Sequence, residues 1–171
     1  MRLAEGRATV GDVDAFLADL DAIATETGCT IQAFDARCVV DATHLRRAVE
    51  LADRAVDRGE NVARDRGVEI LLYAAGRRQI DRALGMGVAE GDCPLVVVCD
   101  AGGGREEADD DAERRAAGRV RDLLDPADTL GDYEPERVRD FFDVTRTELD
   151  ATAGTLPDVV HERVALLDVR K

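Results

Sequence analysis

The chain has 171 residues, enough for one full hydrophobic core but too few for two ordinary domains, so we expect one domain over residues 1–171. An apolar content of 45% excludes a disordered acidic tail, and no apolar run approaches the roughly 20 residues that span a bilayer. The N-terminal segment lacks the apolar region of a signal peptide, so we expect a soluble, cytoplasmic protein with no membrane partner.

The charge is strongly acidic, with 37 acidic residues against 23 basic ones and a formal net charge of -14. Lys171 is the only lysine. A large negative charge with almost no lysine fits a cytoplasm of very high salt, where self-repulsion is screened. The acidic balance is therefore poor evidence against a nucleic-acid ligand. Because salt also weakens phosphate attraction, such a site must rely on stacking and hydrogen bonds.

The first part of the chain alternates strands and amphipathic helices. Apolar spacing and turn residues predict a strand over Met1–Glu5 and a helix over Gly11–Thr27 that Gly28 ends. They also predict a strand over Thr30–Asp35 and a helix from the N-cap Asp41 to about Arg58, which Gly59 ends. The next helix, about Arg64–Ala75, contains ILLYAA, which is apolar on all sides. Such a helix is normally packed through the centre of a domain.

The second part begins where Gly76 breaks that helix and a short helix runs to Gly85 or Gly87. Pro94–Asp100 is the strongest strand and is predicted to be central, because it is apolar on both faces. A charged helix follows Gly102–Gly104, and two or three helices follow Glu134, the last over Pro157–Val169. This order predicts an α/β or α+β fold, a small mixed sheet wrapped by several helices.

The sequence offers little material for metal or nucleophilic chemistry. Its cysteines form no CxxC pair and are predicted to be buried and reduced: Cys29, Cys38, Cys93 and Cys99. The two histidines are His44 and His161, and His44 falls in the first turn of a helix, where a structural role is favoured. We therefore expect no metal, no cofactor and no enzymatic activity.

Gly102–Gly104, between a strand and a helix, suggests a phosphate-binding loop. No Lys-Ser or Lys-Thr follows, and the helix begins with Glu106, Glu107 and Asp109–Asp111, which would repel phosphate. The three aspartates point in different directions on a helix, so a cation site is not favoured either. The Gly102–Asp111 segment is interpreted as a solvated loop and helix start.

A basic segment, Asn61–Ile80, stands out on this acidic chain. Four arginines against two acids give it a net charge of +2, which leaves -16 for the rest. Surface pairing of the arginines with nearby acids is one explanation, and an anion site is the other. Arginines at both ends of a buried helix, a glycine just before Arg77 and Arg78, and a following helix start all favour a site. Gln79 can contact a base edge, and Tyr73 is either a stacking surface or a core residue.

The sequence EILLYAAGRRQI, with Asn61 and Arg64 before it, resembles the signature segment of the PRPK-binding (TPRKB-like) small accessory subunit of the KEOPS complex, in its archaeal, halophilic form. The likeness extends over most of the chain, through IQAFDA, HLRRAVELADRAVDRGEN and CPLVVVCD. The resemblance implies a small mixed α/β domain without catalysis. It also implies binding to the small atypical kinase/ATPase subunit and, through it, to the threonylcarbamoyl-transferase subunit, in the threonylcarbamoyladenosine modification of tRNA position 37.

The resemblance further implies capture of the single-stranded 3′ CCA end of tRNA. Carried onto this chain, that site comprises Asn61, Arg64, Gly76, Arg77, Arg78, Gln79 and Ile80. Two consecutive arginines follow Gly76 where the family pattern has one, which makes Arg77 the less certain contact. The kinase contact is predicted on the last helix, at Val159, Val160, Val164 and Leu167.

Two other functions are left open. The chain can be a purely protein-binding regulator of the kinase that never contacts RNA. A nucleotide-dependent enzyme that uses the Gly102 loop is the third hypothesis.

Overall fold

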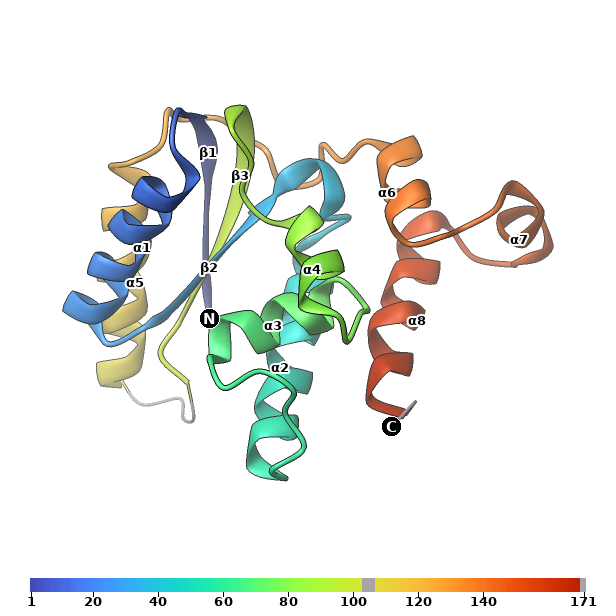
Figure 1. Cartoon of the computed structure of the whole chain (residues 1–171), viewed down its shortest axis with the longest axis horizontal. Coiled ribbons are helices and arrows are strands. Elements are labelled where there is room, and N and C mark those ends of the chain that lie inside the picture. Colours follow the sequence, from blue (N-terminus) through green and yellow to red (C-terminus); the bar gives the residue numbers. More distant parts are fainter. Residues whose placement is uncertain (103–106, 170–171) are drawn as a thin grey trace. The chain divides into compact units, whose positions relative to one another are not determined.

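The computed structural model describes residues 1–102 and 107–169. The chain divides into two compact units. Unit 1 comprises Met1–Asp35 and Gly87–Thr129, and unit 2 comprises Ala36–Met86 and Leu130–Lys171 (Figure 1). Three strands lie in unit 1 and helices form unit 2, so the α+β form of the predicted fold class is confirmed. The extent of the single domain stays a prediction.

Unit 1 is built on a three-stranded sheet in the order β1-β3-β2, formed by β1 (Arg2–Val10), β2 (Thr30–Asp35) and β3 (Gly91–Asp100). Both pairings are antiparallel, so the predicted mixed sheet is wrong. The physical reason lies in the connections. Helix α1 (Val13–Thr27) returns the chain so that β1 and β2 point the same way, but β3 enters between them in the opposite direction.

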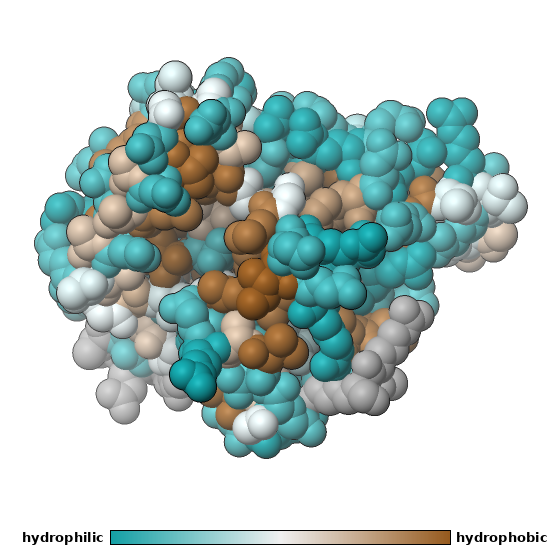
Figure 2. All heavy atoms as spheres, in the orientation of Figure 1, coloured by the Kyte–Doolittle hydropathy of each residue, from teal (hydrophilic) through white to brown (hydrophobic). Residues whose placement is uncertain are grey.

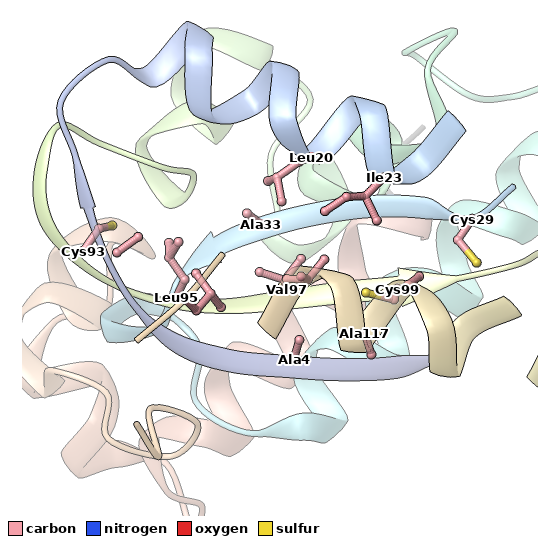
Figure 3. Close-up of a cluster of buried hydrophobic side chains, with 14 of the residues drawn as sticks. Ala4, Leu20, Ile23, Cys29, Ala33, Cys93, Leu95, Val97, Cys99 and Ala117 are labelled. Carbon is pink, nitrogen blue, oxygen red and sulfur yellow. The ribbon is translucent and has the colours of Figure 1, made fainter. Parts of the chain in front are cut away.

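Two helices, α1 and α5 (Glu107–Arg121), cover one face of this sheet (Figure 1). Leu20 and Ile23 of α1 point onto the sheet residues Ala33 and Val97 (Figure 3). Asp12 caps α1 by accepting from the Ala15 amide, and Gly28 ends it at φ 72°. The cysteines are confirmed as buried, free thiols, and burial raises the pKa of Cys99 to about 12.

Close backbone packing fixes the edge of the sheet at Gly6. A Cβ there would lie 2.7 Å from the Asp125 carbonyl oxygen and 2.8 Å from Cβ of Leu124, because residue 7 exchanges two backbone hydrogen bonds with Asp125. Pro94 lies in the central strand opposite Arg7 of β1. Pairing of β3 with β2 ends at Leu95, so Pro94 has no pairing partner on the β2 side. Its missing N–H is thus tolerated.

Unit 2 contains α2 (Ala42–Asp57), α3 (Arg66–Ala74), α4 (Ile80–Ala83), α6 (Pro135–Phe141), α7 (Arg146–Ala151) and α8 (Leu156–Val169), with short 3-10 turns at Ala36–Cys38 and Leu84–Met86. Helix α2 packs against α3 and α8. Asp41 caps α2 by accepting from the His44 amide at 2.8 Å, as predicted. No helix in the described ranges is long and apolar enough to cross a bilayer.

Candidate nucleic-acid interface

Helix α3 is the scaffold of the candidate site. Asp65 caps its start by accepting from the Val68 amide. The last five helix residues, Ile70–Ala74, and the C-cap Ala75 are buried, which confirms the predicted central helix. Tyr73 is 3% exposed, so its ring belongs to the core and is not an open stacking surface. Burial, then Asp168 and Glu69, raise the pKa of Tyr73 to about 12.

The carboxylate of Glu69 folds the preceding loop against α3. Glu69 is 2% exposed, and its Oε2 accepts from the amides of Val62 at 3.0 Å and Ala63 at 2.8 Å. Asn61 donates from its side-chain amide to the Ala63 carbonyl at 2.7 Å. The loop that carries Asn61 and Arg64 is therefore held in place by a buried acceptor.

Gly76 ends α3 in a left-handed turn at φ 60°. The Gly76 amide donates to the Tyr73 carbonyl and the Arg77 amide donates to the Leu72 carbonyl, both at 3.0 Å, which is a Schellman motif. A Cβ at Gly76 would lie 3.5 Å from the Arg163 carbonyl oxygen, an ordinary contact. The glycine is thus needed for the turn itself, which directs Arg77 and Arg78 away from the end of the helix.

Arg77 is held by three contacts from a single segment. Its Nη2 donates to the carbonyl of Phe141 and lies 2.9 Å from Oδ2 of Asp143, and its guanidinium lies 5.7 Å from the Phe141 ring centroid. Asp143 has φ 54°, in the left-handed region that non-glycine residues rarely adopt. Arg77 is therefore a fixed residue of this turn, with much of its donor capacity used within the chain.

Arg78 is exposed, and its Nη2 donates to the Leu167 carbonyl at 3.2 Å. Arg77 and Arg78 line a small hollow with a cavity volume of about 10 Å³, about the space of one water molecule. The hollow is also lined by Glu60, Val62, Glu69, Leu72, Tyr73 and Leu167. This is smaller than the roughly 300–1,000 Å³ of a typical ligand pocket. The hollow is therefore too small to enclose a nucleobase.

The other predicted RNA-binding residues do not line this hollow. Arg64 is exposed and makes no hydrogen bond or ion pair within residues 1–102 and 107–169. Gln79 is the exposed N-cap of α4, and Ile80 is 42% exposed. Arg66, the fourth arginine of the basic segment, instead pairs with Asp53 through Nε at 2.7 Å and Nη2 at 2.9 Å. Two of the four arginines are thus neutralised by carboxylates.

Apolar surface accompanies the exposed arginines. Figure 2 shows hydrophobic atoms on the drawn face over α3 and α4. Val62 is 49% exposed and Leu84 is 57% exposed, and Leu84 follows Ile80 by four residues, about one helical turn. Exposed guanidinium groups beside apolar side chains suit the contact with unstacked bases, which need both a flat apolar surface and hydrogen-bond donors.

The predicted kinase-contact residues on α8 are mostly buried. Val159 is 3% exposed, and Val160 and Val164 are fully buried. Leu167 is half-buried and lines the hollow. A partner can therefore reach Leu167 in this conformation, but not the three valines.

His44 connects α2 to the end of α3. Its Nε2 lies 2.8 Å from the Ala74 carbonyl oxygen, and its ring meets Phe142 edge-on with centroids 5.8 Å apart. Phe142 in turn contacts Phe141 edge-on at 5.1 Å. Burial lowers the pKa of His44 to about 4, so the ring is neutral at pH 7 and donates from Nε2. These rings support the segment that clamps Arg77.

Sequence reasoning missed Glu69, Asp143 and Asp168 as parts of this region. Glu69 is the one acid inside an otherwise apolar helix, a signal that was available. Asp143 and Asp168 reach the turn from more than 60 residues away, and no local pattern marks such contacts.

Within the described ranges, no group of three or more His, Cys, Asp or Glu side chains is placed to hold a metal ion. Gly103 and Gly104, in the glycine loop of the nucleotide hypothesis, lie outside the described residues.

The chain was compared with known proteins. A family model described as kinase binding protein CGI-121 matches residues 11–168, which is nearly the whole chain. The search of curated proteins gave no match.

Proposed function

Because the chain belongs to the kinase binding protein CGI-121 family, we propose that it is a non-catalytic accessory subunit of a KEOPS complex. Its protein partner would be the small atypical kinase/ATPase subunit and, through it, the threonylcarbamoyl-transferase subunit. Its task would be to support threonylcarbamoyladenosine modification of tRNA position 37 in the cytoplasm. The large negative charge suits a high-salt, halophilic archaeal cytoplasm.

The second part of the proposal is that the chain binds the single-stranded 3′ CCA end of tRNA at the turn after α3. The observation that carries it is the placement of Arg78. This exposed guanidinium borders a hollow and follows a turn that is fixed by the Gly76 backbone and by the contacts of Arg77. A rigid scaffold positions such a group for stacking on a base or pairing with a phosphate. Arg64 adds an exposed cation, Gln79 a base-edge donor and acceptor, and Ile80 an apolar contact.

The purely protein-binding alternative is favoured by a different observation. Arg66 and Arg77 are paired with Asp53 and Asp143, and the hollow between Arg77, Arg78 and Leu167 is small. In that case, the exposed apolar side chains Val62, Ile80 and Leu84 would contact a protein instead of RNA bases.

A gel-shift titration of tRNA against the chain separates these functions. We expect intact tRNA to bind more tightly than tRNA trimmed of CCA, and Arg78→Ala to remove that difference. Arg115→Ala is the matched control, because Arg115 is an exposed arginine of α5 in unit 1, far along the chain from the turn. The titration is run in high salt, where loose phosphate contacts are suppressed. Equal binding of the two tRNAs contradicts the RNA proposal, and co-purification of the kinase without RNA supports the alternative.

A further inference from the structure

The carboxylate of Asp168, near the end of α8, lies among three donor groups from two other helices. Its Oδ2 is 3.8 Å from Nη1 of Arg54 and 3.8 Å from Nη1 of Arg58, and its Oδ1 accepts from the Tyr73 hydroxyl at 3.4 Å. Arg54 and Arg58 stand one turn apart at the end of α2. The convergence of two guanidinium groups and a hydroxyl on one carboxylate has the composition of an oxyanion site.

The contacts between the Asp168 carboxylate and the two arginines are too long for good hydrogen bonds. The two arginine contacts are longer than the 2.7–3.2 Å of a hydrogen bond. One negative charge faces two positive ones, although Glu60 lies 4.0 Å from Arg58 and offsets part of the excess. A phosphate group has more acceptor oxygens than a carboxylate and can accept from both arginines and the hydroxyl together. Tyr73 stays protonated at neutral pH and therefore remains a donor.

The same turn of α8 also contacts Arg78, which stays exposed. The carbonyl of Leu167 accepts from Arg78, and the Leu167 side chain lines the hollow with Tyr73. Movement of this last turn would free Arg54, Arg58 and Arg78 together. It would also enlarge the hollow beside the turn to which the RNA end is assigned.

We propose that Arg54, Arg58 and Tyr73 form a phosphate subsite, and that the chain's own Asp168 occupies it until a phosphodiester of a single-stranded RNA displaces the end of α8. The ligand class rests on the proposed function, because the subsite adjoins Arg78 and the hollow at the turn after α3. The anion site itself does not depend on RNA. Asp168 is then an internal competitor that sets the affinity for RNA.

The test uses the full chain with Asp168→Asn, which removes the charge and keeps the size of the side chain. Potassium phosphate is titrated against potassium chloride at matched ionic strength, and ¹H–¹⁵N NMR signals of the arginine side chains report binding. We expect Asp168→Asn to bind phosphate roughly threefold to tenfold more tightly than the parent, the range for release of one or two exposed ion pairs. Adding Arg58→Ala should abolish the gain.

Two controls define the result. Glu162→Gln removes an exposed acid from the same helix and should leave phosphate binding unchanged. If Asp168→Asn does not fold, the parent chain is titrated to higher phosphate, and the signals of Arg54 and Arg58 should shift before that of Arg115. Failure of Asp168→Asn to gain phosphate affinity, or a shift of Arg115 first, overturns the inference.

An RNA arm separates the two proposals. For Asp168→Asn, we expect tighter binding of intact tRNA and a steeper salt dependence, because additional arginines meet phosphates. A gain in phosphate affinity with no effect of CCA trimming leaves the anion subsite in place and contradicts the proposed RNA function. Weaker tRNA binding with an unchanged phosphate affinity shows that Asp168 only tethers α8, and overturns the inference.

Discussion

Nη2 of Arg77 lies 2.9 Å from Oδ2 of Asp143, across 66 residues of sequence, yet the two partners differ greatly in exposure. The Asp143 side chain is 73% exposed, whereas the Arg77 side chain is 21% exposed. Arg77 also donates to the Phe141 carbonyl, and its guanidinium lies over the Phe141 ring. The ion pair is therefore the weakest of the three contacts, because solvent screens an exposed pair. Arg77 supports the turn mainly through its contacts with Phe141.

Unequal effects on stability follow for the two partners. Arg77→Ala should lower the free energy of unfolding by about 1–3 kcal/mol, since it leaves a partly buried carbonyl without its donor. Asp143→Asn, which removes the charge and still suits the left-handed backbone at φ 54°, should change it by less than about 1 kcal/mol. Urea unfolding measures both, with the exposed Arg146→Ala as control. Equal losses from Arg77→Ala and Asp143→Asn would show that the ion pair itself holds the turn.

Glycine-to-alanine substitutions separate the two reasons for a glycine, a left-handed backbone at Gly76 and close packing at Gly6. Gly76→Ala should cost about 1–2 kcal/mol, because φ is 60° there while the space for a methyl group is ordinary. Gly6→Ala should cost more, since its Cβ would meet a backbone oxygen at 2.7 Å. Gly118→Ala on α5, with open space around its Cβ, should stabilise the chain by about 0.5–1 kcal/mol. Thermal unfolding ranks the three variants, and a Gly76→Ala loss as large as that of Gly6→Ala contradicts the local explanation.

His44 makes stability depend on pH in a direction that its burial determines. Its pKa is lowered to about 4 in the folded chain, against about 6.5 when unfolded. Below pH 6.5 the unfolded chain binds the extra proton, so stability falls as the pH drops from about 6.5 to about 4. The loss is on the order of 3 kcal/mol. Above pH 6.5 this contribution is constant.

The measurement compares urea unfolding of the parent chain and His44→Gln at several pH values. Gln retains an N–H donor for the Ala74 carbonyl but does not titrate. Because the many carboxylates titrate in both proteins, only the difference between the two curves reports His44. A difference that stays constant from pH 7 to pH 5 would contradict a neutral, buried His44.

Glu69 should control the order of the loop before α3. Glu69→Ala leaves the amides of Val62 and Ala63 without their acceptor, at a cost of about 1–3 kcal/mol. Glu69→Gln keeps an oxygen at the same place and should cost less. Hydrogen exchange of the two amides should accelerate in Glu69→Ala while that of Leu45 in α2 is unaffected. Unchanged protection at residues 62 and 63 would mean that the carboxylate is not the anchor.

Local signals predicted the elements of the fold well. The strand Thr30–Asp35 matches β2, and Asp41 and Gly28 have the capping roles that their residue types predicted. The central position of β3 followed from its apolar residues on both faces. The first strand extends to Val10, beyond the predicted Glu5, because pairing with β3 overrides the weak strand propensity of Gly6 and Arg7.

Long-range contacts limited the prediction of the site. The sequence indicated the turn at Gly76 and its arginines, and Arg77 and Arg78 do line one hollow. No local pattern predicted that Arg77 contacts Phe141 and Asp143, or that Arg78 donates to the Leu167 carbonyl near the end of α8. The kinase contact was also predicted on three valines of α8 that are buried in the structure. Helix α8 packs against α2 and α3, so its apolar side chains are used within the chain.

Hydrogen–deuterium exchange of the full chain with a short single-stranded RNA ending in CCA tests the central claim most directly. The same RNA without its last three nucleotides is the control. We predict that only the CCA-ending RNA slows exchange at residues 60–80, with the protection lost in Arg78→Ala and kept in Arg115→Ala. Protection confined to unit 1, or equal protection by both RNAs at residues 60–80, would contradict an RNA-end site at the turn after α3.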